Sequence, residues 1–304
     1  MTIAIIFGIL ASLLWAITNH IDKYLITNFE SKSNIKVLLV FSTFIAGIII
    51  SPIWLILSKF YVNISNVSLL CVLLASCIYI IATFFYYKAI EKNDTSMIVI
   101  MFQMLPVFSY LLALLFFKET LTIKQIIGSL IILISSIIIS VDFKDKSNSQ
   151  KYKALLFIIL SCLCYATYYI LFDVGIRNSS YYACAFWYQI GFLIIGSILL
   201  CIKSFRNPFI KIIKENGKKY FALNASNEAF NLIASLMVNF ANVTIPLALA
   251  NILSGFQGTF AFIIGVIGTI FFPKFIKEDL RKRVVIKKSL CIIIGIIGLI
   301  ILVS

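Results

Sequence analysis

The chain has 304 residues, of which 62% are hydrophobic and only 12% are charged. Soluble proteins have about 45–50% apolar and about 25% charged residues, so no soluble core would hold this much apolar surface. Apolar runs near the length of a membrane-spanning helix recur from Ile3 to Val303. The composition therefore predicts a polytopic helical membrane protein and leaves no room for an extramembrane catalytic domain.

The formal net charge of +14 does not predict a nucleic-acid partner. The 26 Lys and Arg residues lie almost wholly in the polar breaks between apolar runs, where membrane proteins keep them. All seven cysteines fall inside apolar runs, so we interpret them as packing residues rather than as disulfides or metal ligands. The first run lacks a basic n-region and a cleavage site, so we expect a retained span rather than a signal peptide.

Ten spans are predicted, and they are helices because the runs show no period-two alternation. They cover residues 3–22, 35–57, 67–89, 95–117, 123–141, 153–174, 181–202, 220–242, 246–271 and 285–303. The most polar stretch of the chain, Asp142–Lys153, follows the fifth span. We therefore predict two five-helix halves, residues 1–143 and 153–304, joined by a polar linker at residues 144–152.

The distribution of basic residues predicts the orientation. Of the Lys and Arg, 22 lie in the connections from odd to even spans and 4 on the opposite side. The positive-inside rule then places the basic loops in the cytoplasm and both termini outside, in a multi-pass protein of the cell membrane. The alternative is that charges follow loop length, because the connections before spans 8 and 10 are the longest.

The two halves show a weak internal repeat. A shift of 150 residues places Trp15 on Tyr165, and a shift of 152 places Ala89 on Ala241. Because five is an odd number, two tandem copies must cross the membrane in opposite senses. That is the inverted-repeat plan of many secondary transporters.

Several segments resemble a known family. The run Ala89-Ile-Glu-Lys-Asn-Asp precedes a span centred on Pro106, and Lys118-Glu119-Thr-Leu-Thr precedes a span that opens near Gly128. Together with Gly8, Trp15 and Ala16 in the first span, these residues resemble the first half of the drug/metabolite transporter superfamily, EamA-like branch. The second half departs from the pattern, because no proline lies opposite Pro106 and Phe272–Lys288 lengthens the turn that carries Glu278.

The resemblance implies an all-α, ten-helix solute carrier with two five-helix inverted repeats around a central cavity. Spans 1, 3, 4, 6, 8 and 9 would line most of that cavity. The resemblance also implies cytoplasmic termini in most members, which conflicts with the orientation that the charge count predicts.

Span 8 carries the most polar side chains of any span. They recur at spacings of three and four, which places them along one stripe of a helix: Asn224, Asn227, Glu228, Asn231, Ser235, Asn239 and Asn242. Such a stripe either lines a cavity or forms interhelical hydrogen bonds. Glu228 lies about 12 Å along the axis from Tyr220, so it is a candidate for proton exchange or for binding a cationic group. A neutral, hydrogen-bonded structural role is the alternative.

Other spans contribute further candidates. Span 9 carries a seam of small residues from Ser254 to Gly268, which we interpret as helix packing. Pro106 predicts a kink in span 4. His20 either takes part in a proton relay or, as we favour, forms an interfacial hydrogen bond. The full predicted substrate-binding set is Trp15, Asn19, Tyr86, Gln103, Tyr165, Tyr169, Trp187, Asn224, Asn227, Glu228, Asn231, Asn251 and Gln257.

The sequence favours a secondary transporter for a small organic metabolite, of the amino acid or amine class, with Glu228 as the proton-coupling residue. An intramembrane enzyme would have only Glu228, Asp173 and His20 to work with, on three different spans. A non-transporting assembly protein is the third class considered. We expect no catalytic residues, cofactor or metal. The expected partners are a small-molecule substrate and the lipid bilayer. The sequence leaves open whether the protein forms a homodimer.

Overall fold

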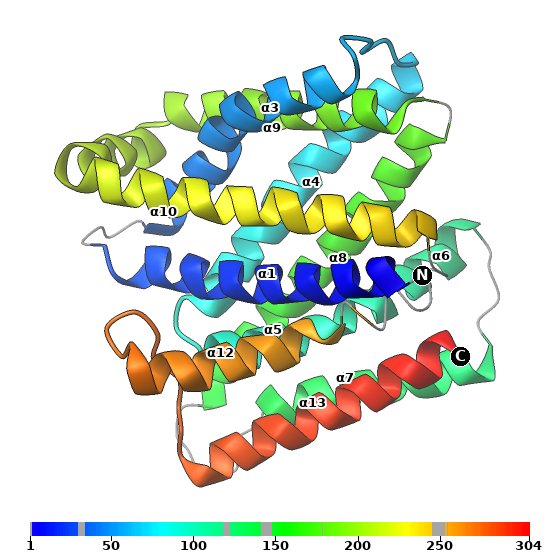
Figure 1. The fold of residues 1–304 in the computed structure, drawn as a ribbon, viewed down its shortest axis with the longest axis vertical. Coiled ribbons are helices and arrows are strands. Elements are labelled where there is room, and N and C mark those ends of the chain that lie inside the picture. The colour runs from blue at the N-terminus through cyan, green and yellow to red at the C-terminus, as the bar shows by residue number, and fades with distance from the viewer. Residues whose placement is uncertain are drawn as a thin grey trace. The chain divides into compact units, whose positions relative to one another are not determined.

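The computed structural model describes residues 2–29, 34–117, 122–140, 148–177, 179–244, 253 and 255–304 (Figure 1). Within these ranges the regular structure is helical, with no strand. The helices are α1 (Thr2–Thr27), α2 (Asn34–Val40), η1 (Phe41–Ile45), α3 (Ala46–Leu57), α4 (Asn66–Ile90), α5 (Thr95–Met101), η2 (Phe102–Met104), α6 (Leu105–Phe117), α7 (Ile123–Ser140), α8 (Asn148–Ile176), α9 (Tyr181–Cys201), α10 (Lys203–Thr244), α12 (Gln257–Phe271) and α13 (Lys282–Val303).

The all-α membrane fold that the composition predicts is confirmed. Among the described residues, seven helical stretches are long and apolar enough to cross a membrane, and α7 and α12 are apolar but shorter. The eighth predicted span lies in α10, where the polar stripe lowers the hydropathy. The protein is an integral membrane protein. The count of ten spans and the inverted repeat stay predictions.

Helix α10 begins far earlier than the span predicted at residues 220–242. Its first part carries apolar side chains that pack inward: Ile212 is fully buried, and the Phe209 ring lies 5.2 Å from that of Phe41. Basic residues cover the other face, so the segment is an amphipathic helix rather than the expected loop. Asn216 (φ −133°) marks a kink between the two parts.

Two spans contain local departures from α-helical geometry. Span 2 contains the π-helical turn η1, and span 4 contains the 3-10 turn η2 immediately before Pro106. Proline has no N–H to bond the carbonyl of residue 102, so the preceding turn tightens. The structure therefore places an irregular turn where the sequence predicted a kink.

The described chain forms two compact units. The first unit comprises Met1–Tyr24, Lys88–Ile159 and Ala229–Ser304, and the second comprises Leu25–Tyr87 and Leu160–Glu228. In the first unit α7 packs along α13 and α5 along α12, and in the second unit α3 packs along α9 (Figure 1). Each pair joins a helix of the first sequence half to the helix five spans later.

Glycines allow the closest of these contacts. A Cβ on Gly128 of α7 would lie 2.6 Å from Leu302 Cβ and 2.7 Å from the Gly298 carbonyl oxygen of α13. Ser135 Oγ adds a hydrogen bond to the carbonyl of Cys291, 2.8 Å away, across the same pair. The Gly128 that contributes to the family resemblance therefore serves helix packing.

The small-residue seam of α12 also serves packing, as the sequence predicted. Gly258, Ala261, Gly265 and Gly268 are all buried, whereas Ser254 lies outside the described residues. Ala261 packs against Ala16 of α1 and Val99 of α5. A Cβ on Gly268 would meet Ile276, so part of the seam receives the chain that follows α12.

Candidate functional site

A group of charged and polar side chains around the buried Lys288 and Glu278 lies in the first unit, and we call Asp94, Ser96, Glu278 and Lys288 the charged cluster. Lys288 of α13 is only 3% exposed, and its Nζ lies 2.7 Å from Asp94 Oδ2 and 2.5 Å from Glu278 Oε2. Ser96, in the first turn of α5, donates from its hydroxyl and its backbone N–H to the Glu278 carboxylate, at 2.6 Å and 3.0 Å. Every member of the cluster is thus paired, as buried charges must be.

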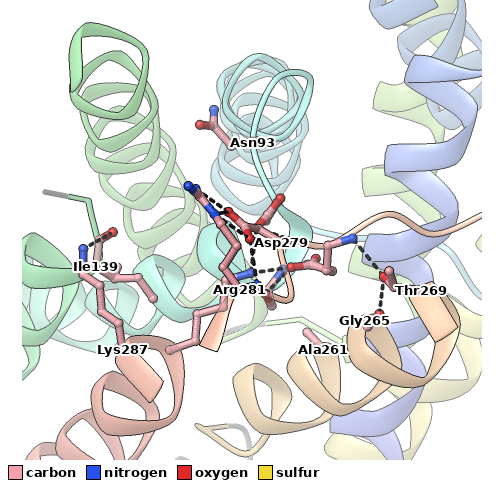
Figure 2. Close-up of polar contacts among 12 residues, drawn as sticks. Asn93, Ile139, Ala261, Gly265, Thr269, Asp279, Arg281 and Lys287 are labelled. Carbon is pink, nitrogen blue, oxygen red and sulfur yellow. Dashed lines mark hydrogen bonds and ion pairs between the residues drawn. The ribbon is translucent and has the colours of Figure 1, made fainter. Parts of the chain in front are cut away.

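The segment after α12 folds back to deliver Glu278. The backbone N–H of Glu278 donates to Thr269 Oγ1 at 2.9 Å, and the Thr269 hydroxyl donates to the Gly265 carbonyl at 2.7 Å (Figure 2). Gly265 leaves the space that the acid occupies, because a Cβ there would lie 2.7 Å from Glu278 Cγ. The longer turn, which departs from the family pattern, therefore positions Glu278 in the charged cluster.

The turn between α4 and α5 is held from α1. Lys23 Nζ donates to the carbonyls of Ile90, Glu91 and Asn93 at 2.7–3.0 Å. These carbonyls belong to the end of α4 and the turn after it, where backbone acceptors lack helical partners and the dipole is negative. The turn that presents Asp94 to Lys288 is consequently fixed.

A more exposed ion pair stands beside the cluster. Arg281 Nη2 lies 2.7 Å from Asp279 Oδ2, and both residues precede α13 (Figure 2). The hydrogen bond from Arg281 holds the pKa of the Asp279 carboxyl below its usual value. The pair is largely solvated, so its stabilising effect is small.

Two predicted site residues meet between α1 and α12. Gln257 Nε2 donates to Asn19 Oδ1 at 2.8 Å. One turn further along, the buried His20 donates through Nε2 to the carbonyl of Ala261 at 2.9 Å. His20 thus forms a hydrogen bond with a backbone group in the core, and not the interfacial hydrogen bond that we favoured.

The remaining described candidates of the first unit lie on α1, η2 and α10. Gln103 is buried, donates to the Gly255 carbonyl at 3.4 Å, and packs against Gly258 and Gly295. Trp15 and Asn231 are half-buried on α1 and α10, and Asn251 lies outside the described residues. The structure places Gln103 in a helix contact, and its predicted cavity-lining role stays a prediction.

The second unit contains an aromatic group, which we call the tyrosine cluster: Tyr79, Tyr165, Tyr168, Tyr188 and Phe192. Around the ring of Tyr79 on α4, the ring centres of the other four lie 5.1–6.0 Å away, on α8 and α9. The four tyrosines are half-buried. The cluster therefore combines ring packing with partial exposure of its tyrosines.

Hydrogen bonds fix the edge of the tyrosine cluster. The hydroxyls of Tyr165 and Thr83 lie 2.9 Å apart, and Ser161 Oγ donates to the carbonyl of Ala82 at 2.8 Å. Both contacts join α8 to α4. Tyr165, which the repeat singled out, consequently has a defined orientation.

Other predicted residues of the second unit lie around this cluster or on α10. Tyr169 is half exposed with its ring centre 4.9 Å from that of Tyr168, and Trp187 Nε1 donates to the Val62 carbonyl at 2.8 Å. Tyr86, Asn224 and Asn227 are buried, and Glu228 is half-buried. Neither amide atom of Asn224 has a hydrogen bond within the described part of the chain.

Sequence reasoning missed the charged cluster and Tyr79. Lys288 was counted as a loop charge although it falls inside the span predicted at residues 285–303, and a lysine inside a span signals a buried partner. Asp94 and Glu278 are 184 residues apart in sequence, and no pattern in the chain links them. Tyr79 lies on a span whose aromatic residues showed no distinctive spacing.

Two comparisons with known proteins each found a match. Residues 2–141 match the EamA-like transporter family. A stretch of 97 residues is 31% identical to an uncharacterised protein of Methanocaldococcus jannaschii, and it covers 32% of this chain and 71% of that protein. The family match spans α1 to α7, so it includes Asp94 and Tyr79, whereas Glu278 and Lys288 lie beyond it.

Proposed function

This chain belongs to the EamA-like transporter family, and we propose that it moves a small organic metabolite of the amino acid or amine class by alternating access. Family membership and the apolar helices make it a membrane transporter of the drug/metabolite type. What we propose beyond family membership is the class of solute, the proton coupling and the binding site of the solute.

The tyrosine cluster carries this proposal. Four half-buried tyrosines on three helices form a group that is aromatic and neutral. Aromatic faces attract organic cations, by about 0.5–2 kcal/mol per ring, and they also bind apolar groups. An amine or amino acid with an apolar side chain matches both properties.

Buried amides add polar recognition. In a membrane protein an amide without a hydrogen bond costs free energy, so it is kept where a ligand or water completes it. Asn224 is 1% exposed and lacks such bonds within the described residues. Within the second unit, Asn227 and Glu228 continue the same polar stripe of α10, and the predicted residue Asn231 follows in sequence.

The helix pairing supports the two-half plan of residues 1–143 and 153–304. In an inverted repeat, a helix and its counterpart five spans later are related by a pseudo-two-fold axis. Helices near such an axis pack on their own counterparts, as α5 does on α12, α7 on α13 and α3 on α9. The plan also gives Trp15 and Tyr165 equivalent places in the two sequence halves, and we propose that each contributes its ring to solute binding.

Glu228 is the residue proposed for proton coupling, because it is a half-buried acid in the polar stripe of a membrane helix. Glu228→Gln keeps the size and most hydrogen bonds but cannot release a proton. The variant should fold and lose proton-driven accumulation while retaining exchange. If Glu228 instead binds the cationic group of the solute, the Gln variant should lose affinity.

Uptake into proteoliposomes tests the proposed function. Purified protein is reconstituted with an imposed pH gradient and screened with labelled amino acids and amines, with empty liposomes as the control. Accumulation of at least one solute by the wild type supports the proposal. Chemical conversion of the solutes would favour an enzyme, and neither movement nor conversion across the screen would favour an assembly protein.

The orientation of the protein is proposed from its charge asymmetry: the basic loops face the cytoplasm of the cell. The structure supports a common side for three of these loops, because Asp94, Gln150 and Arg281 line one pocket. A cysteine introduced at Lys282 tests this orientation with an impermeant thiol reagent on intact cells, in a background lacking the natural cysteines. Labelling from outside would place this loop outside the cell and contradict the proposed orientation.

A further inference from the structure

The first part of α10, Lys203–Glu215, lies between two stretches that are predicted to span the membrane, and we call it the basic segment. It follows α9, which ends at Cys201, and it ends at the kink at Asn216 (Figure 1). At 1.5 Å per residue its helix is only about 20 Å long, which is too short to cross a hydrocarbon core of about 30 Å. The basic segment therefore runs along one surface of the membrane.

One side of the basic segment packs on the rest of the second unit. Phe205, Phe209 and Ile212 recur at spacings of four and three, so they lie on one side of the helix. The Phe209 ring centre lies 5.2 Å from that of Phe41, and Lys36 Nζ lies 5.2 Å from the centre of the Phe205 ring. Helix α2 and the turn η1 thus cover this side.

The other side mixes exposed apolar residues with cations. Its residues follow one another at spacings of three and four and are all exposed: Lys203, Arg206, Ile210 and Ile213, with Lys214 beside them. Ile210 and Ile213 are 42% and 39% exposed. In the headgroup region of a bilayer, isoleucines reach the acyl chains while long cationic side chains extend to the phosphates. The stripe therefore has the composition of a helix that lies in the membrane interface.

The charge balance favours an anionic surface. Residues 203–219 and the stretch 28–36, which contacts α10 through Phe29 and Lys36, together contain eight cations and two acids. The net charge of +6 counts both acids, so it does not depend on ion pairs within the chain, such as the loose contact of Lys211 with Glu215 at 3.9 Å. An excess of this size attracts an anionic membrane surface.

We propose that the basic segment is an interfacial helix that binds anionic phospholipids. Ile210 and Ile213 enter the boundary between headgroups and acyl chains, and Lys203, Arg206 and Lys214 contact the phosphates. An acidic soluble protein would satisfy the charge but would have to cover the isoleucines as well, whereas a bilayer that already surrounds both neighbouring spans does both. Each Lys or Arg near an anionic surface strengthens binding about fivefold.

Charge removal with a local probe tests the lipid preference. A bimane fluorophore on Ile213→Cys, in the background that lacks the seven natural cysteines, reports lipid beside the basic segment through quenching by doxyl-labelled lipid in mixed micelles. We expect half-maximal quenching by phosphatidylglycerol at a mole fraction at least tenfold lower than by phosphatidylcholine. Lys203→Gln with Lys214→Gln should abolish this preference, and Lys203→Arg with Lys214→Arg should keep it.

The matched control is Lys59→Gln with Lys124→Gln, which removes the same charge from two exposed positions outside α10. It should retain the preference, and thermal unfolding in detergent checks that each double variant is folded. Equal quenching by the two lipids without charge removal, or the same preference in both Gln double variants, overturns the proposal.

The depth of the helix gives a test that needs no charge removal. Ser204 is exposed and lies nine residues before Ile213, which places it on the opposite side of the helix. Nitroxide labels on Ser204→Cys and Ile213→Cys are compared in phosphatidylcholine vesicles containing phosphatidylglycerol. We expect the label at 213 to be more accessible to oxygen than to a water-soluble nickel chelate, and the label at 204 to show the reverse. Equal access of the chelate to both labels would mean that the stripe faces water, where a soluble protein could bind it, and would overturn the proposal.

Discussion

The charged cluster of the first unit and the tyrosine cluster of the second use their polar groups in opposite ways. Lys288 and the carboxylate of Glu278 are almost fully buried and satisfy each other, with Ser96 completing the acid. The tyrosines are half-buried. Buried charged groups that pair with each other hold helices together, whereas partly exposed aromatic side chains are able to bind a solute.

The largest effect should come from removing the buried cation. Lys288→Met leaves two carboxylates without their partner, and breaking a buried pair in this way costs about 3–5 kcal/mol. Thermal unfolding in detergent should show a lower Tm and a lower yield of folded protein.

Arg281→Met is the matched control, since it removes a cation from a solvated pair worth about 1 kcal/mol or less. Equal loss of stability in the two variants would remove the distinction between a saturated core cluster and a surface pair.

A smaller effect is expected from filling the space beside Glu278. In Gly265→Ala the added Cβ would lie 2.7 Å from Glu278 Cγ, so the acid must shift away from Lys288. Overpacking of this kind costs about 1–3 kcal/mol, measured as a decrease in Tm. Gly217→Ala in α10 is the control, because its Cβ would meet only Ile213, at 3.7 Å. An unchanged Tm in Gly265→Ala would indicate that the charged cluster tolerates a shift of Glu278.

The tyrosine cluster can be separated into ring and hydroxyl contributions. Tyr165→Phe removes the hydrogen bond to Thr83 and should lower stability by about 1 kcal/mol while leaving solute affinity nearly unchanged. Tyr165→Ala and Trp15→Ala should each weaken binding by about 1 kcal/mol, because the ring itself is lost. Isothermal titration with the transported solute measures the affinity of each variant, and thermal unfolding measures the stability of Tyr165→Phe. Unchanged affinity in both Ala variants would assign the two rings to packing.

The smallest effect concerns acid stability at the edge of the charged cluster. The folded-state pKa of Asp279 is lowered by Arg281 from an ordinary value of 3.8, so the pair stabilises the fold above that pH. The contribution is lost as the pH falls through the lower, folded-state pKa. The difference in Tm between wild type and Arg281→Gln should therefore shrink below about pH 4. A constant difference down to pH 2 would mean that the pair does not titrate.

The sequence predicted the elements of the fold well, because membrane helices are specified by runs of apolar residues that can be located locally. It also predicted the packing seam of α12, and it predicted a kink at Pro106, close to which the structure has a 3-10 turn. The early start of α10 was missed because its amphipathic first part is basic enough to look like a loop.

Site prediction was limited by sequence distance. Asn19 and Gln257 were both proposed, but only the fold joins them. Lys288 was counted only as a loop cation when the orientation was predicted. Its burial against Asp94 and Glu278 could therefore not be recognised. Pairing across separate helices depends on which helix faces meet, and a single sequence does not specify this.

The most direct test of the central claim is the affinity of the transported solute for Tyr79→Leu, measured at equilibrium in detergent. Tyr79 lies at the centre of the tyrosine cluster, and leucine keeps apolar bulk without a ring. Phe240→Leu in the first unit, which removes a ring paired with Phe7, is the control. We predict at least tenfold weaker binding for Tyr79→Leu, equivalent to about 1.4 kcal/mol, and wild-type affinity for the control. Wild-type affinity in a folded Tyr79→Leu variant would contradict the account.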